Sequence, residues 1–198
     1  KDGGAEHFQR TIEAVRISNP KIIIEVLVPD FNDKDWALEM VMEARPHIFN
    51  HNIETVERLT PLVRSRAKYG RSLTVLKKAK DMVDGKVATK SGLMLGLGER
   101  EEEIFQAMDD LREHGVTVLT MGQYLRPTAM HVPVVEYITP ERFEELRHIA
   151  LTTGFRHVAS GPLVRSAYHA ADFHPEEDVL DAIESDLAKR AESKIEQG

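Results

Sequence analysis

The chain has 198 residues, of which 41% are apolar and 30% are charged, and this balance suits one soluble globular domain with a sizeable core. The formal net charge of −7 argues against a nucleic-acid partner and against an anionic membrane surface, because both bind a basic face. The sequence contains no cysteine, which excludes disulfides and any thiolate-bound metal or cluster within this chain. No apolar run approaches the roughly 18 residues that span a bilayer, and a cytoplasmic location is the ordinary expectation.

The first residues predict a turn that is followed at once by a helix. Residues 1–5 hold an Asp-Gly-Gly turn, and Phe8, Ile12 and Val15 then recur at helical spacing. Such a turn before a helix is typical of a loop that joins a strand to a helix. We therefore expect the chain to be the back portion of something longer, with a processed N-terminus as the alternative.

Two strand–helix units come next. Residues 21–28 (KIIIEVLV) form a nearly continuous β-branched run, typical of a strand buried on both faces of a parallel sheet. Asp33 is placed to cap the following helix, and Pro46 ends it. Residues 47–56 (HIFNHNIETV) predict a short strand that passes into a polar loop, and residues 69–79 carry a helical apolar face.

Residues 89–99 (TKSGLMLGLGE) predict the strand around which the chain is organised. The apolar residues at 93–97 indicate a buried strand, and the glycines at its end leave room for a close approach. We expect a helix to begin at Glu99, with more glutamates at 101–103 near the positive end of the helix dipole. Gly115 is expected at the C′ position of that helix.

The last third of the chain predicts one more unit, an extended piece and a helix. Residues 116–125 (VTVLTMGQYL) form the fourth predicted strand. Thr139 is expected to cap a helix that has proline at its first position and ends near Gly154. Residues 156–163 are a further extended piece, and a charged helix follows from Pro175.

Strands that alternate with helices predict an α/β fold with a parallel sheet and right-handed crossovers. A TIM-type barrel and a doubly wound sheet both fit this order, and both collect chemistry at the carboxyl ends of their strands. We expect residues 1–173 to form this domain and residues 174–198 to form a charged helical tail.

Polar side chains stand where the predicted strands end. Asn52 and Glu54 alternate along an extended segment, so they are expected to point the same way. An amide and a carboxylate on one side suit hydroxyl and ammonium groups, such as those of a ribose or an amino acid. Gln123 and Arg126 follow the fourth strand. The alternative is that Asn50 and Asn52 simply close a turn.

Three familiar kinds of site are disfavoured. The glycine turn at 96–98 has Glu101 where a dinucleotide fingerprint needs its third glycine, and the acidic run at 99–103 would repel a phosphate. His47 and His51 are four residues apart but lack the helical context of a zinc protease motif. The sequence has no GxSxG motif, so it does not predict a serine hydrolase.

Six segments in collinear order resemble the lipoyl synthase family of radical S-adenosylmethionine (SAM) enzymes. They are DGGAEHF at 2–8, EVLVPDF at 25–31, FNHNIETV at 49–56, TKSGLMLGLGE at 89–99, GQYLRPT at 122–128 and ASGPLVRSAYHA at 159–170. The resemblance covers about residues 1–173 and adds nothing from His174 onward.

The resemblance implies a partial parallel (β/α) barrel of the radical-SAM type, to which this chain would contribute strands three to six and a C-terminal extension. The family comprises sulfurtransferases of lipoate biosynthesis. One [4Fe–4S] cluster cleaves SAM to a 5′-deoxyadenosyl radical, and a second, auxiliary [4Fe–4S] cluster gives up sulfur to C6 and C8 of a protein-bound octanoyl chain. The implied partners are octanoylated lipoyl-carrier domains, namely E2 subunits and the glycine cleavage H protein.

The same resemblance assigns site residues. The residues of the SAM site would be Asn52, Glu54, Gly92, Met94, Gly96, Glu99 and Gln123, of which four fit the family pattern GxIxGxxE beside the adenine. There the glycines would let the nucleoside lie against the backbone. The residues of the substrate or auxiliary-cluster region would be Arg126, Arg165, Ser166 and Tyr168.

The chain departs from the family at two points. Both cysteine motifs, including CxxxCxxC, are absent, so neither cluster has thiolate ligands in this chain. The family motif RSSY is RSAY here, with Ala167 at the position of the serine that binds the auxiliary cluster. Ser166 as a substitute ligand, an open iron position and a divergent parent enzyme are the alternatives.

We therefore expect an incomplete and, by itself, inactive part of a lipoyl synthase. Two other classes of function remain as alternatives. One is a non-catalytic half-barrel that binds octanoylated carrier domains, which a pull-down would detect. The other is a metal-free TIM-type lyase or isomerase acting on a small phosphorylated substrate, against which the acidic run after Gly98 speaks.

Overall fold

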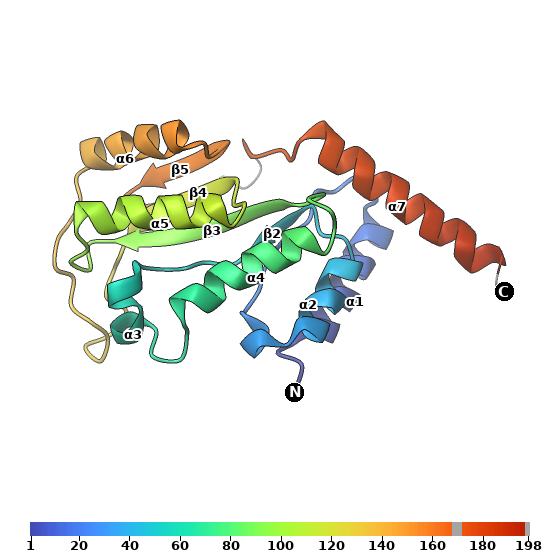
Figure 1. Cartoon of the computed structure of the whole chain (residues 1–198), viewed down its shortest axis with the longest axis horizontal. Coiled ribbons are helices and arrows are strands. Elements are labelled where there is room, and N and C mark those ends of the chain that lie inside the picture. Colours follow the sequence, from blue (N-terminus) through green and yellow to red (C-terminus); the bar gives the residue numbers. More distant parts are fainter. Residues whose placement is uncertain (168–171, 197–198) are drawn as a thin grey trace.

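The computed structural model describes residues 1–167 and 172–196, which form one layer of parallel strands covered by helices (Figure 1). In chain order the elements are α1 (Ala5–Ser18), β1 (Glu25–Leu27), η1 (Phe31–Asp33), α2 (Asp35–Glu43), β2 (Ile48–Asn50), η2 (Glu57–Leu59), α3 (Thr60–Val63), α4 (Tyr69–Asp81), β3 (Ala88–Leu95), α5 (Glu101–Glu113), β4 (Val118–Gln123), α6 (Pro140–Thr153), β5 (His157–Gly161) and α7 (Glu177–Glu196). The predicted α/β class is confirmed.

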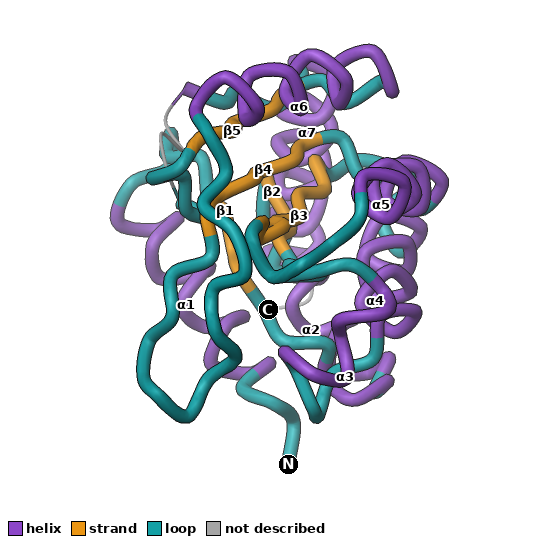
Figure 2. Tube along the Cα trace, turned by 90° about the vertical axis from the view of Figure 1, so that its left-hand side faces the viewer, coloured by secondary structure: helices purple, strands orange, loops and turns teal. Residues whose placement is uncertain are grey.

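The five strands are all parallel, and their spatial order equals their order in the chain. A doubly wound sheet reverses its strand order at a switch point, whereas a TIM-type barrel adds each new strand on the same side. The extended piece at 156–163 contains β5, which pairs with β4 as a fifth parallel strand beyond the four predicted units. Helices α4, α5 and α6 lie along the outer side of this sheet (Figures 1 and 2). The architecture is therefore a sector of a parallel (β/α) barrel.

Strand β3 separates the core from the barrel interior by the alternation of its side chains. Leu93 and Leu95 belong to the buried hydrophobic cluster beneath the helices. Lys90 points to the opposite side, where its ammonium group lies 2.9 Å from the carboxylate of Glu25 in β1. The Asn50 amide also donates to Glu25, at 2.8 Å. Because a buried charge needs a partner, this ion pair accounts for a lysine that is only 3% exposed.

Local signals predicted several helix ends correctly. The hydroxyl of Thr139 accepts a hydrogen bond from the Arg142 N–H at 3.2 Å, as expected of an N-cap. Gly115 follows the last residues of α5 with a φ of 81°, and Gly154 ends α6 with a φ of 105°. Both glycines thus hold the left-handed conformation that commonly ends a helix.

The predicted cap at Asp33 is wrong. Helix α2 begins at Asp35, and its N-cap residue is Lys34. Asp30 instead forms the local turn, because its carboxylate accepts from the Asn32 N–H at 3.1 Å. Asp33 lies in the resulting η1 turn and faces Arg71 at 3.8 Å.

The predicted helix start at Glu99 is also wrong, by two residues. Helix α5 begins at Glu101 behind the N-cap residue Arg100, whose N–H donates to the Glu103 carboxylate at 2.8 Å. The side chain of Glu99 turns back and accepts from the Leu97 N–H at 2.8 Å. Glu99 therefore stabilises the turn that precedes the helix, and Glu103 stabilises the first turn of the helix itself.

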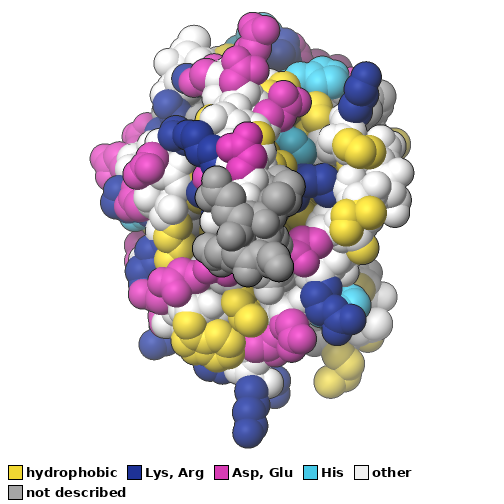
Figure 3. Space-filling view, turned by 90° about the vertical axis from the view of Figure 1, so that its right-hand side faces the viewer, with side chains coloured by type: hydrophobic (Ala, Val, Ile, Leu, Met, Phe, Trp, Pro, Cys, Tyr) yellow, Lys and Arg dark blue, Asp and Glu magenta, His cyan; other side chains and the backbone are white. Residues whose placement is uncertain are grey.

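Helix α7 lies against the ends of α2 and α4 and then runs outward (Figure 1). Its Ile183 is 2% exposed, and Asp186 pairs with Arg45 at 2.6 Å. On the coloured part of the surface at this side of the molecule, acidic and basic side chains are interspersed (Figure 3).

None of the helices within the described ranges combines the length and apolar character that crossing a membrane requires. The division into a domain over 1–173 and a tail over 174–198 stays a prediction.

Candidate functional site

A cavity of about 290 Å³ opens at the carboxyl ends of the strands. These strand ends face the viewer in Figure 2. The lining of the cavity comes from β1, the segment after β2, β3, β4 and the segment after β5: Leu27, Asn52, Glu54, Gly92, Leu93, Met94, Thr120, Gly122, Gln123, Leu125, Val164, Arg165 and Ser166. This is the end of a parallel sheet at which binding sites form.

The amide of Asn52 connects the two sides of this cavity. Asn52 and Glu54 both line it, so the prediction that they point the same way is confirmed. The Asn52 Nδ2 group donates to the Glu54 carboxylate at 3.1 Å and to the Ser166 hydroxyl at 2.7 Å. The Asn52 Oδ1 atom is buried and has no hydrogen-bond partner among the described residues. A buried amide oxygen without a donor is a place where a ligand hydroxyl or N–H group would be stabilised.

Gly92 gives the cavity its depth. A Cβ atom at this position would stand 2.8 Å from Asn52 Oδ1 and 2.9 Å from Thr120 Oγ1, closer than non-bonded atoms tolerate. Glycine therefore lets the polar groups of two neighbouring strand ends approach one another across β3. Met94, two residues on, supplies an apolar wall on the same side of the strand.

Gly96 serves a different contact. A Cβ atom there would stand 2.3 Å from the Glu136 carbonyl oxygen and 2.4 Å from Gln123 Nε2, and its φ is 97°. The Gln123 amide donates to the Leu95 carbonyl at 3.2 Å and to the Glu136 carbonyl at 3.0 Å, and its oxygen accepts from the Ile138 N–H at 2.9 Å. The space beside Gly96 is thus filled by the loop between β4 and α6. Its predicted contact with a nucleoside stays a prediction.

Glu99 is not among the residues that line the cavity. One carboxylate oxygen is held by the Leu97 N–H, and the other, Oε1, is buried and has no partner within the described part of the chain. Burial raises the pKa of Glu99 above its ordinary range, against the opposing effect of the backbone N–H groups around it. Its position beside an adenine stays a prediction.

The predicted residues of the substrate region separate into three groups. Arg165 and Ser166 line the cavity. Arg126 does not, because its guanidinium group binds the carbonyl groups of Ala129 and His131 within its own loop. Ala167 is exposed, and Tyr168 lies outside the described residues.

Sequence reasoning missed Thr120, Leu27 and Val164 as lining residues. A signal for Thr120 was available, because it precedes Gly122 by two residues on β4 and so faces the same side of the strand. Its partner in the sheet is Gly92. Val164 could not be found in this way, since it reaches the cavity through a turn after β5.

Both His47 and His51 make close contacts to backbone groups. His47 Nδ1 accepts from the Ile24 N–H at 3.0 Å, and His51 Nδ1 lies 2.8 Å from the Val28 carbonyl oxygen. Within residues 1–167 and 172–196, no group of three or more His, Asp or Glu side chains could hold a metal ion.

The strand order and the cavity at the strand ends define a partial parallel (β/α) barrel. The chain superposes on the crystal structure of methylornithine synthase with a TM-score of 0.54 and 14% identity, over 95% of this chain and 64% of that one. This likeness concerns the fold alone. No protein-family model matches the chain.

At the level of sequence the chain is similar to lipoyl synthases. It is 58% identical over 169 residues to lipoyl synthase from Rubrobacter xylanophilus, and the aligned region covers 85% of this chain and 52% of the relative. It is 53% identical over 178 residues to lipoyl synthase from Chlorobaculum parvum, and the aligned region covers 90% of this chain and 60% of the relative. The chain thus spans between half and about three fifths of the length of the curated relatives it matches. The resemblance expected from the motifs is confirmed: the chain is homologous to part of lipoyl synthase.

Proposed function

We propose that this chain is the part of a lipoyl synthase that forms the nucleoside-facing wall of its SAM site. The whole enzyme would insert sulfur at C6 and C8 of octanoyl groups on lipoyl-carrier domains of E2 subunits and the glycine cleavage H protein, in the cytoplasm. One observation carries the proposal. Asn52, Glu54, Gly92 and Met94, which come from two separate motifs, line one cavity at the strand ends of a chain up to 58% identical to lipoyl synthase.

The residues of the cavity fit an adenosyl group. Asn52 Oδ1 needs a donor, and the Glu54 carboxylate can accept from hydroxyl groups, so the two together suit the vicinal hydroxyls of a ribose. Leu27, Met94 and Leu125 supply apolar surface for a planar base. SAM bound there would supply the hydrogen-abstracting chemistry, while these residues would bind and orient its nucleoside.

The same residues do not fit an iron–sulfur cluster. The chain has no cysteine, and Ala167 carries a methyl group that cannot bind iron. The hydroxyl of Ser166, the possible substitute, accepts from the Asn52 amide at 2.7 Å. The 198-residue chain therefore offers no ligand set for a cluster, and we expect the chain alone to be inactive.

Ligand-observed NMR tests the proposal on the chain itself. We expect saturation transfer from the protein to the ribose and adenine protons of SAM, and its loss in Asn52→Ala, because that change removes both the amide donor and the free oxygen. The matched control is Asn19→Ala, at an exposed position after α1. An equal signal in wild type, Asn52→Ala and Asn19→Ala would contradict the assignment of the site.

An activity assay tests the second half of the proposal. After anaerobic treatment with iron, sulfide and a strong reductant, the 198-residue chain should release no 5′-deoxyadenosine from SAM, because it has no thiolate ligands. Release of 5′-deoxyadenosine above the level of a protein-free control would refute this.

One observation favours the second candidate, a non-catalytic half-barrel that binds octanoylated carrier domains. Leu125 lines the cavity and its side chain is 49% exposed. Exposed apolar side chains at a cavity mouth suit an acyl chain. Retention of octanoylated, but not of unmodified, carrier domain by the immobilised chain would support this candidate.

A further inference from the structure

The segment that carries Asn52 and Glu54 begins where β2 loses its neighbour β1. The last ladder contact between the two strands is the bond from the Val28 N–H to the Asn50 carbonyl, at 3.0 Å. From there the strands diverge, and side chains form hydrogen bonds with the backbone carbonyl groups that no longer face a neighbouring strand. The carbonyl of Val28 lies 2.8 Å from His51 Nδ1, and the carbonyl of Asn52, on the edge that faced β1, accepts from Arg64 at 3.0 Å.

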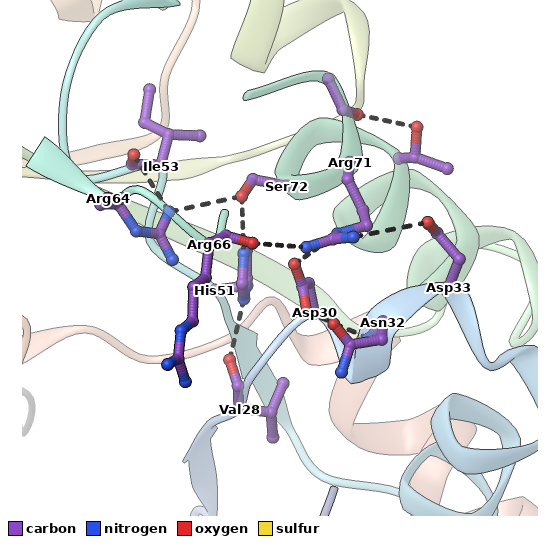
Figure 4. Close-up of polar contacts among 12 residues, drawn as sticks. Val28, Asp30, Asn32, Asp33, His51, Ile53, Arg64, Arg66, Arg71 and Ser72 are labelled. Carbon is purple, nitrogen blue, oxygen red and sulfur yellow. Dashed lines mark hydrogen bonds and ion pairs between the residues drawn. The ribbon is translucent and has the colours of Figure 1, made fainter. Parts of the chain in front are cut away.

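Arg64 reaches this segment from the connection between α3 and α4 (Figure 4). The same Nη1 group lies 3.0 Å from the Asn52 carbonyl, 3.3 Å from the Ile53 carbonyl and 3.4 Å from the Ser72 hydroxyl. Arg64 is not among the residues that line the cavity. Its guanidinium group therefore contacts the backbone of the site and not the space where a ligand would lie.

His51 and Ser72 fix the direction of the Arg64 side chain. A carbonyl oxygen can only accept, so His51 Nδ1 donates to Val28. In the neutral ring the other nitrogen, Nε2, then accepts from the Ser72 hydroxyl at 2.9 Å. This leaves the oxygen of Ser72 free to accept from Arg64. His51 and Ser72 are 2% and 0% exposed, so water does not compete for these bonds.

The opposite edge of the segment is held by β3. The Glu54 N–H donates to the Gly92 carbonyl at 2.9 Å, and the Glu54 carbonyl accepts from the Met94 N–H at 2.8 Å. Between these two bonds Glu54 adopts a φ of 67°, a conformation that residues other than glycine rarely hold. Such a conformation persists only where the surroundings impose it, here β3 on one edge and Arg64 on the other.

We propose that Arg64 is a positioning residue for the adenosyl site: with Ser72 and His51 it holds the Asn52–Glu54 backbone so that the amide and the carboxylate face the cavity together. This inference rests on the proposed function, since it takes the ligand to be a nucleoside with vicinal hydroxyls. Arg64 binds no part of the ligand and acts through the carbonyl groups of Asn52 and Ile53.

The test compares variants of the 198-residue chain by the dissociation constant for SAM from NMR titration and by amide hydrogen exchange at Glu54 and Met94. Arg64→Ala should weaken binding about tenfold and speed exchange at both amides, because charged hydrogen bonds to two carbonyl groups are lost. Arg64→Lys should recover part of the affinity, since an ammonium group keeps the charge but lacks the planar fork. Ser72→Ala should weaken binding about threefold by freeing the Arg64 side chain.

Arg66→Ala is the matched control. Its carbonyl accepts from Arg71 at 3.1 Å, and its side chain extends away from Ser72 in Figure 4. We expect wild-type affinity and exchange from this variant. Wild-type affinity in both Arg64→Ala and Ser72→Ala would overturn the proposal, and so would a loss in Arg64→Ala that Arg64→Lys does not restore in any part.

The two readouts separate this proposal from the function on which it rests. If the wild-type chain does not bind SAM, the proposed function fails for this chain, and hydrogen exchange alone decides the role of Arg64. If the amide of Glu54 exchanges as fast in Arg64→Lys and Ser72→Ala as it does in Arg66→Ala, the positioning role of Arg64 is refuted. If Arg64→Ala does not fold, these two milder variants decide in the same way.

Discussion

At the scale of single residues, the cavity depends on a glycine that lies between two polar side chains. Gly92 on β3 is flanked by Asn52 Oδ1 and Thr120 Oγ1, which a Cβ atom would meet at 2.8 and 2.9 Å. Neither neighbour can retreat freely, because Thr120 is 4% exposed and the Asn52 amide is bonded to both Glu54 and Ser166. The packing of Asn52 and Thr120 around Gly92 therefore sets the shape of the site.

Gly92→Ala should abolish saturation transfer to SAM and lower the free energy of unfolding by about 1–3 kcal/mol, the usual cost of overpacking. The control is Gly70→Ala, since a Cβ atom at Gly70 in α4 has no neighbour within 4 Å. That variant should bind as wild type and gain up to about 1 kcal/mol from helix propensity. Denaturant unfolding and NMR check both. A Gly92→Ala chain that binds SAM normally would contradict the account of the cavity.

A second prediction at the residue scale concerns His47. Burial lowers the pKa of His47 from its ordinary 6.5 to about 4, with Arg16 adding to the effect, and its Nδ1 accepts from the Ile24 N–H at 3.0 Å. Below pH 6.5 the unfolded chain takes up a proton that the folded chain resists. The contribution of His47 to the free energy of unfolding should therefore be fully present above pH 6.5, and the free energy should fall by up to about 3 kcal/mol towards pH 4.

Denaturant unfolding at several pH values between 7 and 4 measures this effect. His47→Gln should flatten the dependence, whereas the same change at the exposed His7 should leave it as in wild type. The buried His51 adds a decrease of the same sign, because burial lowers its pKa too. The hydrogen bond to the Val28 carbonyl and the charge of Asp30 oppose this shift, whereas Arg64 and Arg71 add to it. A stability that rises from pH 7 to pH 5 would contradict this explanation.

At the scale of elements, one side chain connects two of them. Gln123 is the last residue of β4. Its side-chain amide donates to the Leu95 carbonyl at the end of β3 and to the Glu136 carbonyl in the loop before α6, and its oxygen accepts from the Ile138 N–H of that loop. A Cβ atom at Gly96 in the same turn would clash with the Glu136 carbonyl oxygen and with the Gln123 amide, because the loop packs against this glycine. The loop between β4 and α6 is therefore part of the structure that surrounds the cavity.

Gln123→Glu should release this loop. The change keeps the shape of the side chain but turns a carboxylate oxygen towards carbonyl oxygens, which removes two donors and buries a charge. We expect a loss of about 2–4 kcal/mol in the free energy of unfolding and faster amide exchange at Ile138. Gln9→Glu, at a partly exposed position of α1, is the control for the added charge. Unchanged exchange at Ile138 would show that Gln123 does not hold the loop.

The sequence predicts those elements whose signals are local. Thr139, Gly115 and Gly154 act on their own helices, and all three are where the pattern places them. Asp33 and Glu99 were misassigned because the deciding partners, the Asp30 carboxylate and the Leu97 N–H, offer turns that compete with the helix.

For the site, the alternation of Asn52 and Glu54 predicted that both side chains face one side, as they do at the cavity. The extended conformation assumed for that prediction is not present at Glu54, whose φ is 67°. Two other contacts could not be predicted from spacing. Ser166 meets Asn52 across 114 residues, and Arg64 reaches the same segment from the connection between α3 and α4. Both depend on how the barrel closes around β2, which periodicity does not encode.

At the scale of the whole molecule, the described sheet has two edges, β1 and β5, and a helix that extends beyond it. Helix α7 is attached by the buried side chain of Ile183 and by the ion pair between Asp186 and Arg45 at 2.6 Å. Free sheet edges are sites of association between chains. We therefore expect the isolated 198-residue chain to be aggregation-prone or only marginally stable, and a sharp, reversible two-state melt of a monomer would contradict this.

The attachment of α7 can be tested separately. Ile183→Ala should cost about 2–4 kcal/mol, because it leaves a cavity beneath a side chain that is 2% exposed. Ile17→Ala, at a position that is 82% exposed, should change stability by less than about 0.5 kcal/mol. Amide exchange along α7 should quicken only in the first variant. Equal effects of the two changes would show that α7 is not packed on the body.

The central claim is that the strand-end cavity of this chain is the nucleoside-facing wall of a SAM site. An NMR titration of the isotope-labelled chain with SAM tests it most directly. We predict that amide shifts will concentrate at Asn52–Glu54, Gly92–Met94 and Thr120–Gly122, which surround the cavity, with little change in α1 or α7. Shifts that are absent from these three segments, or that concentrate elsewhere in the chain, would contradict the claim.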